Sequence, residues 1–196
     1  MARKKSVKTS ANRFKAAADD ISLFLTTVSL GQSDSHVTWL HNYAIIRLYR
    51  AFESLMLDCL IGAINNDTST VSAKTGINFP KHLTDEVCEY IVIGSGYFDF
   101  KGRDGLLRTL KQFVPDNHYV ITAVKKDKYK NTLEQLSALR NLAAHESGKS
   151  KRAALAAISA QKLSASGAWL KGKGRMTAVI SKLKELADEI HLAAPF

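Results

Sequence analysis

An arginine, an asparagine and a histidine occur within six residues of the sequence, at Arg140, Asn141 and His145. A guanidinium group binds anions, and an imidazole can accept or donate a proton near neutral pH. On a helix, Asn141 and His145 share a face, whereas Arg140 and His145 are about 140° apart. Both can meet one ligand only if the helix ends or bends near His145, or if a second subunit completes the site. Gly148 favours such an ending.

Two charged residues interrupt the apolar faces of predicted helices. Glu53 falls on the apolar face of a long helix expected over residues 35–65, and Arg140 falls on the apolar stripe of a helix over residues 128–146. Because a charge in a packed stripe is costly unless it is paired, the pattern predicts a buried Glu53–Arg140 interaction. An ion pair that only locks the helices together, or long side chains that reach solvent from the stripe edge, would explain the pattern equally well.

The string from Arg140 to His145 resembles the motif of the HEPN superfamily, which has arginine, a polar residue, three variable residues and histidine. The form Leu-Arg-Asn…Ala-His, and a long earlier helix with an internal glutamate, are similar to the stand-alone bacterial proteins of the RNase LS and toxin type. The resemblance covers about residues 36–192, and its specific part is the six-residue motif.

This resemblance implies a metal-independent endoribonuclease of the toxin or phage-defence type, active as a homodimer that brings two motifs into one cleft. A 2′-hydroxyl of RNA would attack the adjacent phosphorus and leave a 2′,3′-cyclic phosphate. His145 would be the general acid or base, and Arg140 would hold the scissile phosphate. Asn141 would orient His145 or contact the substrate, and Glu53 would support Arg140. The sequence predicts no cofactor and no metal site.

Two other functions remain open for the same residues. The first is a non-catalytic RNA-binding or protein-interaction module that keeps the motif for structural reasons. The second is a regulated protein that a nucleotidyltransferase modifies, on Ser147 or on a tyrosine near the motif. An antitoxin is a further candidate partner.

The chain is basic overall, but its charge is unevenly distributed. It has 28 Lys and Arg residues against 18 Asp and Glu, a net charge of +10. Residues 16–100 carry a net charge of −6, whereas residues 101–152 carry +7. The second segment includes Lys149, Lys151 and Arg152, which directly follow the motif and could bind an RNA backbone or could simply form a solvated helix start. We expect residues 1–9 to be a basic flexible arm and residues 10–196 to be a single domain.

The residue pattern predicts an all-α protein, a HEPN-like bundle of about four main helices plus short extra ones. Residues 118–124 are ambiguous between strand and helix, residues 68–80 are expected to be irregular, and residues 164–175 a loop. Trp39, Tyr43 and Tyr49 are expected in the core. In all, helices are expected at about residues 10–29, 35–65, 84–93, 104–114, 128–146, 148–162 and 176–192.

The cysteines and the hydropathy of the sequence indicate in which cellular compartment the protein is expected. The two cysteines, Cys59 and Cys88, lie 29 residues apart and predict neither a disulfide scaffold nor a metal site. No apolar run approaches the roughly 18 residues that a membrane span needs. We therefore expect a cytoplasmic protein without membrane contact.

Overall fold

The computed structural model describes residues 5–195. Within this range all regular structure is helical, and no strand is present, so the prediction of an all-α fold is confirmed. The elements are α1 (Val7–Val28), α2 (Asp34–Asn66), α3 (Ser69–Thr75), α4 (Asp85–Ile93), α5 (Gly102–Leu110), α6 (Tyr119–Lys125), the 3-10 turn η1 (Asp127–Tyr129), α7 (Lys130–His145), α8 (Gly148–Ala157), α9 (Ser166–Leu170) and α10 (Arg175–Ala193).

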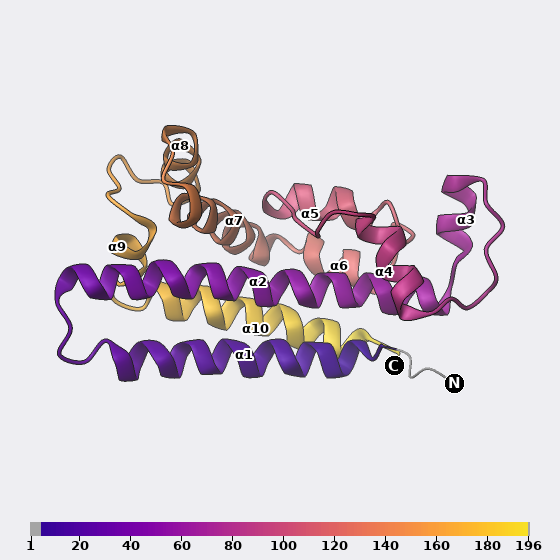
Figure 1. The fold of residues 1–196 in the computed structure, drawn as a ribbon, viewed down its shortest axis with the longest axis horizontal. Helices are drawn as coiled ribbons and strands as arrows, with labels where there is room; N and C mark the ends of the chain where they lie inside the picture. The colour runs from indigo at the N-terminus through magenta and orange to yellow at the C-terminus, as the bar shows by residue number, and fades with distance from the viewer. Residues whose placement is uncertain (1–4, 196) are drawn as a thin grey trace.

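Three long helices form one elongated layer. Helix α1 packs against α2 and α10, and all three run side by side (Figure 1). The shorter helices lie along the opposite side of α2, which contacts α4, α7 and α9. Helix α2 is therefore the element that connects the long layer to the helix carrying Arg140 and His145.

Helix α2 forms because its sequence supplies both a cap and an almost continuous buried surface. The Ser33 side chain accepts a hydrogen bond from the backbone N–H of His36, which caps the helix start. The ring of Phe52 meets Phe14 of α1 at 5.7 Å and Phe100 at 5.9 Å, measured between ring centroids. Burying a side chain of this size stabilises the fold by roughly 1.5–3 kcal/mol, which fixes α2 within the core.

A buried carboxylate ties α1 to α2. Asp58 is only 7% exposed. Its oxygens lie 2.8 Å from Lys5 Nζ and 2.8 Å from Arg13 Nη2, and the Ser10 hydroxyl also donates to Asp58. These partners compensate the desolvation of the charge, so Asp58 is a structural anchor.

The prediction of a flexible basic arm over residues 1–9 is wrong for residues 7–9, which belong to helix α1. Ser6 accepts a hydrogen bond from the N–H of Thr9, and Val7 is completely buried, so α1 begins at Val7 rather than at residue 10. Lys5 belongs to the Asp58 ion pair. The rest of the expected arm, residues 1–4, lies outside the described residues.

Two segments that were expected to be irregular contain short helices: α3 lies within residues 68–80, and α9 lies within residues 164–175. Helix α9 docks against α2 and α7: the Ser166 hydroxyl donates to the carbonyl of Leu139 over 2.7 Å, and the Gly167 N–H donates to Asn42. A Cβ atom at Gly167 would collide with the backbone carbonyl of Thr38, so glycine is required for this close approach. Tertiary contacts therefore determine α9, and local periodicity could not reveal it.

Other boundaries also differ from expectation. The ambiguous segment forms α6, whose Val120, Ile121 and Val124 are buried. Helix α8 ends at Ala157, about five residues earlier than expected, because Ser159 adopts a left-handed conformation with φ 51°. Helix α5 likewise begins at Gly102 and ends at Leu110.

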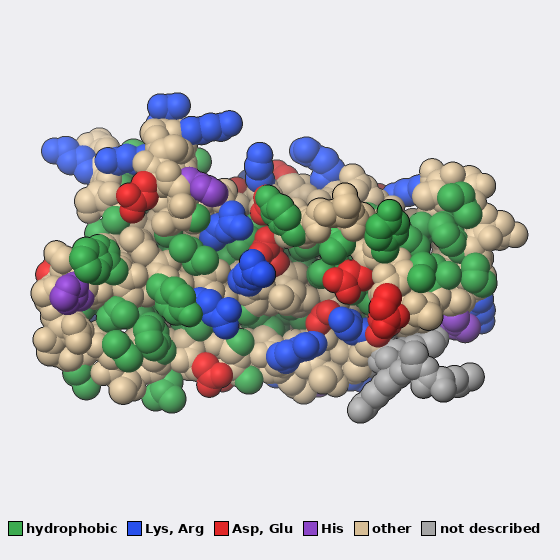
Figure 2. All heavy atoms as spheres, viewed as in Figure 1, with side chains coloured by type: hydrophobic (Ala, Val, Ile, Leu, Met, Phe, Trp, Pro, Cys, Tyr) green, Lys and Arg blue, Asp and Glu red, His purple; other side chains and the backbone are tan. Residues whose placement is uncertain are grey.

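Apolar side chains remain exposed where α1 ends and α2 begins, on the left of Figure 2. Trp39 is 64% exposed and Tyr43 is 54% exposed, so their expected place in the core is wrong, whereas Tyr49 is buried as expected. Leu23 and Leu30 are also exposed. We call these four exposed residues, Leu23, Leu30, Trp39 and Tyr43, the apolar end. Among the described residues, no helix combines the length and the hydropathy that crossing a membrane demands.

Candidate functional site

Helix α7 ends at His145, as the motif requires if its arginine and histidine are to meet one ligand. Glu146 takes the left-handed conformation with φ 42°, and its N–H bonds to the carbonyl of Leu142. Ser147 then caps α8 in a reciprocal capping box with Ser150. The chain thus turns at Glu146, whereas the sequence suggested Gly148, which is the first residue of α8.

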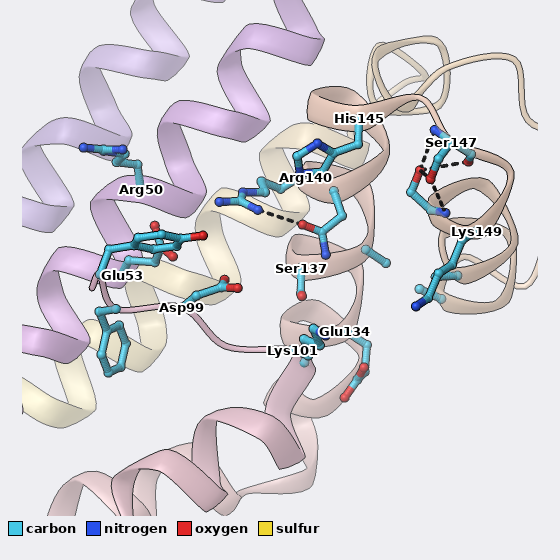
Figure 3. A pocket seen from close by; sticks show the side chains of 18 of the residues that line it. Arg50, Glu53, Asp99, Lys101, Glu134, Ser137, Arg140, His145, Ser147 and Lys149 are labelled. Atoms are coloured by element: carbon cyan, nitrogen blue, oxygen red, sulfur yellow. Dashed lines mark hydrogen bonds between the residues drawn. The ribbon is translucent and has the colours of Figure 1, made fainter. Parts of the chain in front are cut away.

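The three motif residues line one cleft of about 1150 Å³. Its walls come from α2, α7, α8, the end of α4 and the segment that joins α4 to α5. Figure 3 shows the His145 ring and the Arg140 side chain on the same side of α7, directed towards α2. Arg140, Asn141 and His145 therefore face a common space that a ligand can occupy.

Two neighbours hold the Arg140 guanidinium in this cleft. Its central carbon lies 4.6 Å from the centroid of the Tyr49 ring, a cation–π contact. Its Nη1 donates a hydrogen bond to Oδ1 of Asn141 over 2.8 Å. Arg140 is consequently fixed by an aromatic face on α2 and by the next residue of its own helix.

Tyr49 is itself held rigidly. Its hydroxyl lies 2.7 Å from Oδ1 of Asp99 and 2.8 Å from the carbonyl of Phe100, both acceptors, and it accepts from the N–H of Phe100. Its ring stacks on Phe100 with centroids 5.0 Å apart. Burial raises the pKa of Tyr49, so the phenol stays neutral and serves as a scaffold for Arg140.

Glu53 faces the same cleft, and its interaction with Arg140 is electrostatic rather than a direct ion pair. No ion pair among the described residues joins these two side chains, and the buried Oε1 of Glu53 has no hydrogen-bond partner. Tyr49, one helical turn before Glu53, makes the direct contact of α2 with the guanidinium. Burial raises the pKa of Glu53 to about 7, although the charge of Arg140 opposes this shift.

Asn141 is engaged with Arg140 rather than with His145. Its Oδ1 accepts the Arg140 hydrogen bond, and His145 is an exposed residue of the cleft. The role of Asn141 in this structure is therefore to orient Arg140. Its amide group still borders the cleft and can contact a ligand there.

Only part of the predicted basic segment reaches the cleft. Lys149 lines it, whereas Lys151 and Arg152 are exposed on α8 outside the lining. Figure 2 shows Lys and Arg side chains gathered over α8. These groups extend the positive surface beyond the cleft.

Sequence reasoning missed several lining residues. Arg50 precedes Glu53 by three residues on α2, so helical periodicity could have placed both at one cleft. Tyr97, Asp99 and Lys101 lie between α4 and α5, where no periodic pattern indicates orientation.

No group of three or more His, Cys, Asp or Glu side chains is positioned to hold a metal ion in the part of the chain that the structure describes. The chemistry that the cleft can support with its own side chains is anion binding by Arg140 and Lys149 and proton transfer by His145.

Comparison with known proteins gives no relative: no family model, no curated protein and no solved structure matches this chain.

Proposed function

We propose that the protein is a metal-independent endoribonuclease that cleaves RNA by internal attack of a 2′-hydroxyl. The observation that carries the proposal is the shared cleft of Arg140, Asn141 and His145 at the end of α7. A fixed guanidinium can neutralise a phosphate, and an exposed imidazole beside it can move a proton. The similarity of the motif to that of the HEPN superfamily agrees with this chemistry, and a role in toxicity or phage defence belongs to the same proposal.

In the proposed reaction, the 2′-oxygen loses its proton to a base and forms a bond to phosphorus. The bond from phosphorus to the 5′-oxygen breaks, and an acid protonates that oxygen. The products are a 2′,3′-cyclic phosphate and a 5′-hydroxyl. Arg140 would stabilise the charge on the non-bridging oxygens during the displacement.

The reaction requires a base and an acid, and His145 is the histidine that lines the cleft of one protomer. A homodimer that joins two clefts would supply two histidines, one for each role. The exposed side chains of the apolar end, especially Trp39 and Tyr43, support association with a partner, because soluble proteins rarely leave such groups clustered and uncovered.

The experiment is an RNA cleavage assay in EDTA with the wild type, Arg140→Ala, Arg140→Lys and His145→Ala. We expect cleavage by the wild type and a loss of at least about 100-fold in His145→Ala, because general acid–base catalysis contributes about that much. Arg140→Lys keeps the charge but loses the planar fork, so intermediate activity is expected.

Matched controls are available outside the cleft. His82→Ala and Arg108→Ala remove exposed side chains that do not line it, and both variants should keep wild-type activity. Full activity in His145→Ala, or loss of wild-type cleavage in EDTA, would contradict the proposal.

A second candidate is a non-catalytic RNA-binding or protein-interaction module. The hydrogen bond from Arg140 to Asn141 and the contact with Tyr49 favour it, because both give the motif a structural role. It predicts RNA binding without cleavage, and a fold that Arg140→Ala destabilises. An antitoxin or a nucleotidyltransferase that modifies Ser147 remains a proposed partner under either function.

A further inference from the structure

The cleft is lined by charges of both signs, which phosphate binding alone does not explain. Its cationic side chains come from α7 and α8, from α2 and from the segment before α5; they are Arg140, Lys149, Arg50 and Lys101. The lining also contains four carboxylates. These repel phosphate, so in a cleft that binds RNA a carboxylate that the fold leaves unpaired is suited to a ligand group that donates hydrogen bonds. The four residues are Glu53, Glu89, Asp99 and Glu134.

Two of these carboxylates are already engaged within the fold. Asp99 lies 2.7 Å from the Tyr49 hydroxyl, and Glu134 accepts a hydrogen bond from the backbone N–H of Arg103 over 3.0 Å. Glu53 differs, because its half-buried side chain lines the cleft while its buried Oε1 has no hydrogen-bond partner within the fold. The fold leaves this carboxyl group with unused acceptor capacity, and the part of the side chain that borders the cleft can accept a hydrogen bond from a ligand.

Glu53 also lies next to the phosphate-binding side of the cleft. It projects from α2 one turn beyond Tyr49, whose ring contacts Arg140, and the charge of Arg140 acts directly on the Glu53 carboxyl. A phosphate held by Arg140 therefore places the attached nucleoside near Glu53. Figure 3 shows Glu53, Asp99 and Arg140 converging from α2, the α4–α5 segment and α7.

An aromatic ring is present at the same cleft. Tyr97 lines the cleft and is 81% exposed, whereas the following aromatic, Phe98, is buried. An exposed ring at the edge of a cleft offers a face on which an unpaired base can stack, and such stacking tolerates every base. Stacking would hold a base, but it would not select one.

From this arrangement we propose that Glu53 accepts a hydrogen bond from the exocyclic amino group of a nucleobase that stacks on Tyr97. The cleft would then take cytosine, adenine or guanine in preference to uracil, which presents a carbonyl oxygen where cytosine has its amino group. This inference rests on the proposed function, because it requires RNA in the cleft. It adds a base preference that the motif itself does not contain.

Cytosine and uracil make the sharpest comparison, because they have nearly the same shape. Short 2′-O-methyl oligonucleotides of cytidine and of uridine cannot be cleaved by 2′-hydroxyl attack, so their binding is measured separately from catalysis. The experiment is fluorescence anisotropy at constant salt and at pH 8, where the Glu53 carboxyl is largely ionised. We expect the wild type to bind the cytidine oligonucleotide about tenfold more tightly.

Three variants assign the preference to its residues. Glu53→Gln, which can accept or donate, should reduce the preference to within about twofold. Glu86→Gln, the same change at an exposed site outside the cleft, should leave it intact. Tyr97→Ala should weaken both oligonucleotides by about tenfold and leave their ratio unchanged.

The outcomes separate this inference from the proposed function. Equal binding of the two oligonucleotides by the wild type, an unchanged preference in Glu53→Gln, or no binding of either oligonucleotide would overturn the inference. Cleavage of natural RNA without base preference would leave the ribonuclease proposal intact and remove the base site. A cytosine preference without any cleavage would support the base site and contradict the ribonuclease proposal.

Discussion

The guanidinium of Arg140 lies over the ring of Tyr49, with 4.6 Å between the guanidinium carbon and the ring centroid. The two interrupted apolar stripes indicated an interaction of Arg140 with Glu53, and the charge of Arg140 does act on that carboxyl, but the ring of Tyr49 makes the direct contact. An aromatic face fixes the position of a guanidinium without neutralising its charge, whereas a carboxylate in contact would compensate that charge. Arg140 therefore keeps its full charge towards the cleft.

Two substitutions of Tyr49 should distinguish the role of its ring from the role of its hydroxyl group. Tyr49→Phe keeps the ring under Arg140, and we expect RNA cleavage within about threefold of the wild type despite some loss of stability. Tyr49→Leu removes the ring, and kcat/KM should fall about tenfold, since a desolvated cation–π contact contributes up to roughly 2 kcal/mol. The measurement is steady-state cleavage well below the unfolding temperature of each variant.

Tyr129 is the matched control for this pair. It is also buried and also has a cation over its ring, Lys128 at 4.9 Å, but it does not line the cleft. Tyr129→Leu should lower the unfolding temperature and leave kcat/KM unchanged. An equal loss of activity in Tyr49→Leu and Tyr129→Leu would reduce the role of Tyr49 to general packing.

The Glu53 carboxyl should make stability depend on pH. Its pKa of about 7 in the folded protein exceeds the ordinary value of 4.5, and Arg50, Arg140 and Asp99 are the charged groups that act on it. Between pH 4.5 and pH 7 the Glu53 carboxyl is ionised in the unfolded chain but still protonated in the folded protein. The contribution of Glu53 is therefore fully present below about pH 4.5, and it is lost as pH rises through 7.

Glu53→Gln should remove this dependence. At pH 8 the variant should be more stable than the wild type by about 1 kcal/mol, a value reduced for the solvent screening of a half-buried group. That gain corresponds to roughly 2–4 °C in unfolding temperature, and it should disappear near pH 4.5. Thermal unfolding at pH 8 and at pH 4.5 measures this gain. A Glu53→Gln variant less stable than the wild type at pH 8 would contradict the claim that burying the ionised Glu53 carboxyl destabilises the fold.

Asp58 should be the most sensitive charged residue of the scaffold. Asp58→Ala leaves Lys5 and Arg13 without their shared partner and should destabilise the fold by about 3 kcal/mol. Asp188 pairs with Lys15 of α1 at 2.7 Å but is exposed, so Asp188→Ala should cost less than about 1 kcal/mol. Urea unfolding compares the two, and similar losses would argue against the anchoring role.

The turn at Glu146 is expected to carry backbone strain. Because glycine adopts a positive φ without steric cost, Glu146→Gly should stabilise the protein by about 1 kcal/mol, whereas Glu146→Ala should bring no comparable gain. Urea unfolding of both variants measures the difference. A destabilised glycine variant would show that the Glu146 side chain, and not the backbone, holds the end of α7.

Sequence periodicity predicted the features that depend on one helix alone. The long helix containing Glu53, the helix containing Arg140 and its ending near His145 all follow from local spacing and capping. The partner of Arg140 could not be predicted in the same way, because Tyr49 appears in the sequence as one more apolar residue of α2. Tyr97 and Asp99 enter the cleft through a segment without periodicity, and α9 forms because Gly167 can approach α2 closely.

The central claim is that RNA is cleaved by its own 2′-hydroxyl in the cleft of Arg140 and His145. Its most direct test is mass spectrometry of the RNA products formed in EDTA, together with a substrate that carries one 2′-deoxynucleotide at the cleavage position. We expect 2′,3′-cyclic phosphate ends, no cleavage at the deoxynucleotide, and no products from His145→Ala. Products with 3′-hydroxyl ends, or cleavage at the deoxynucleotide, would contradict it.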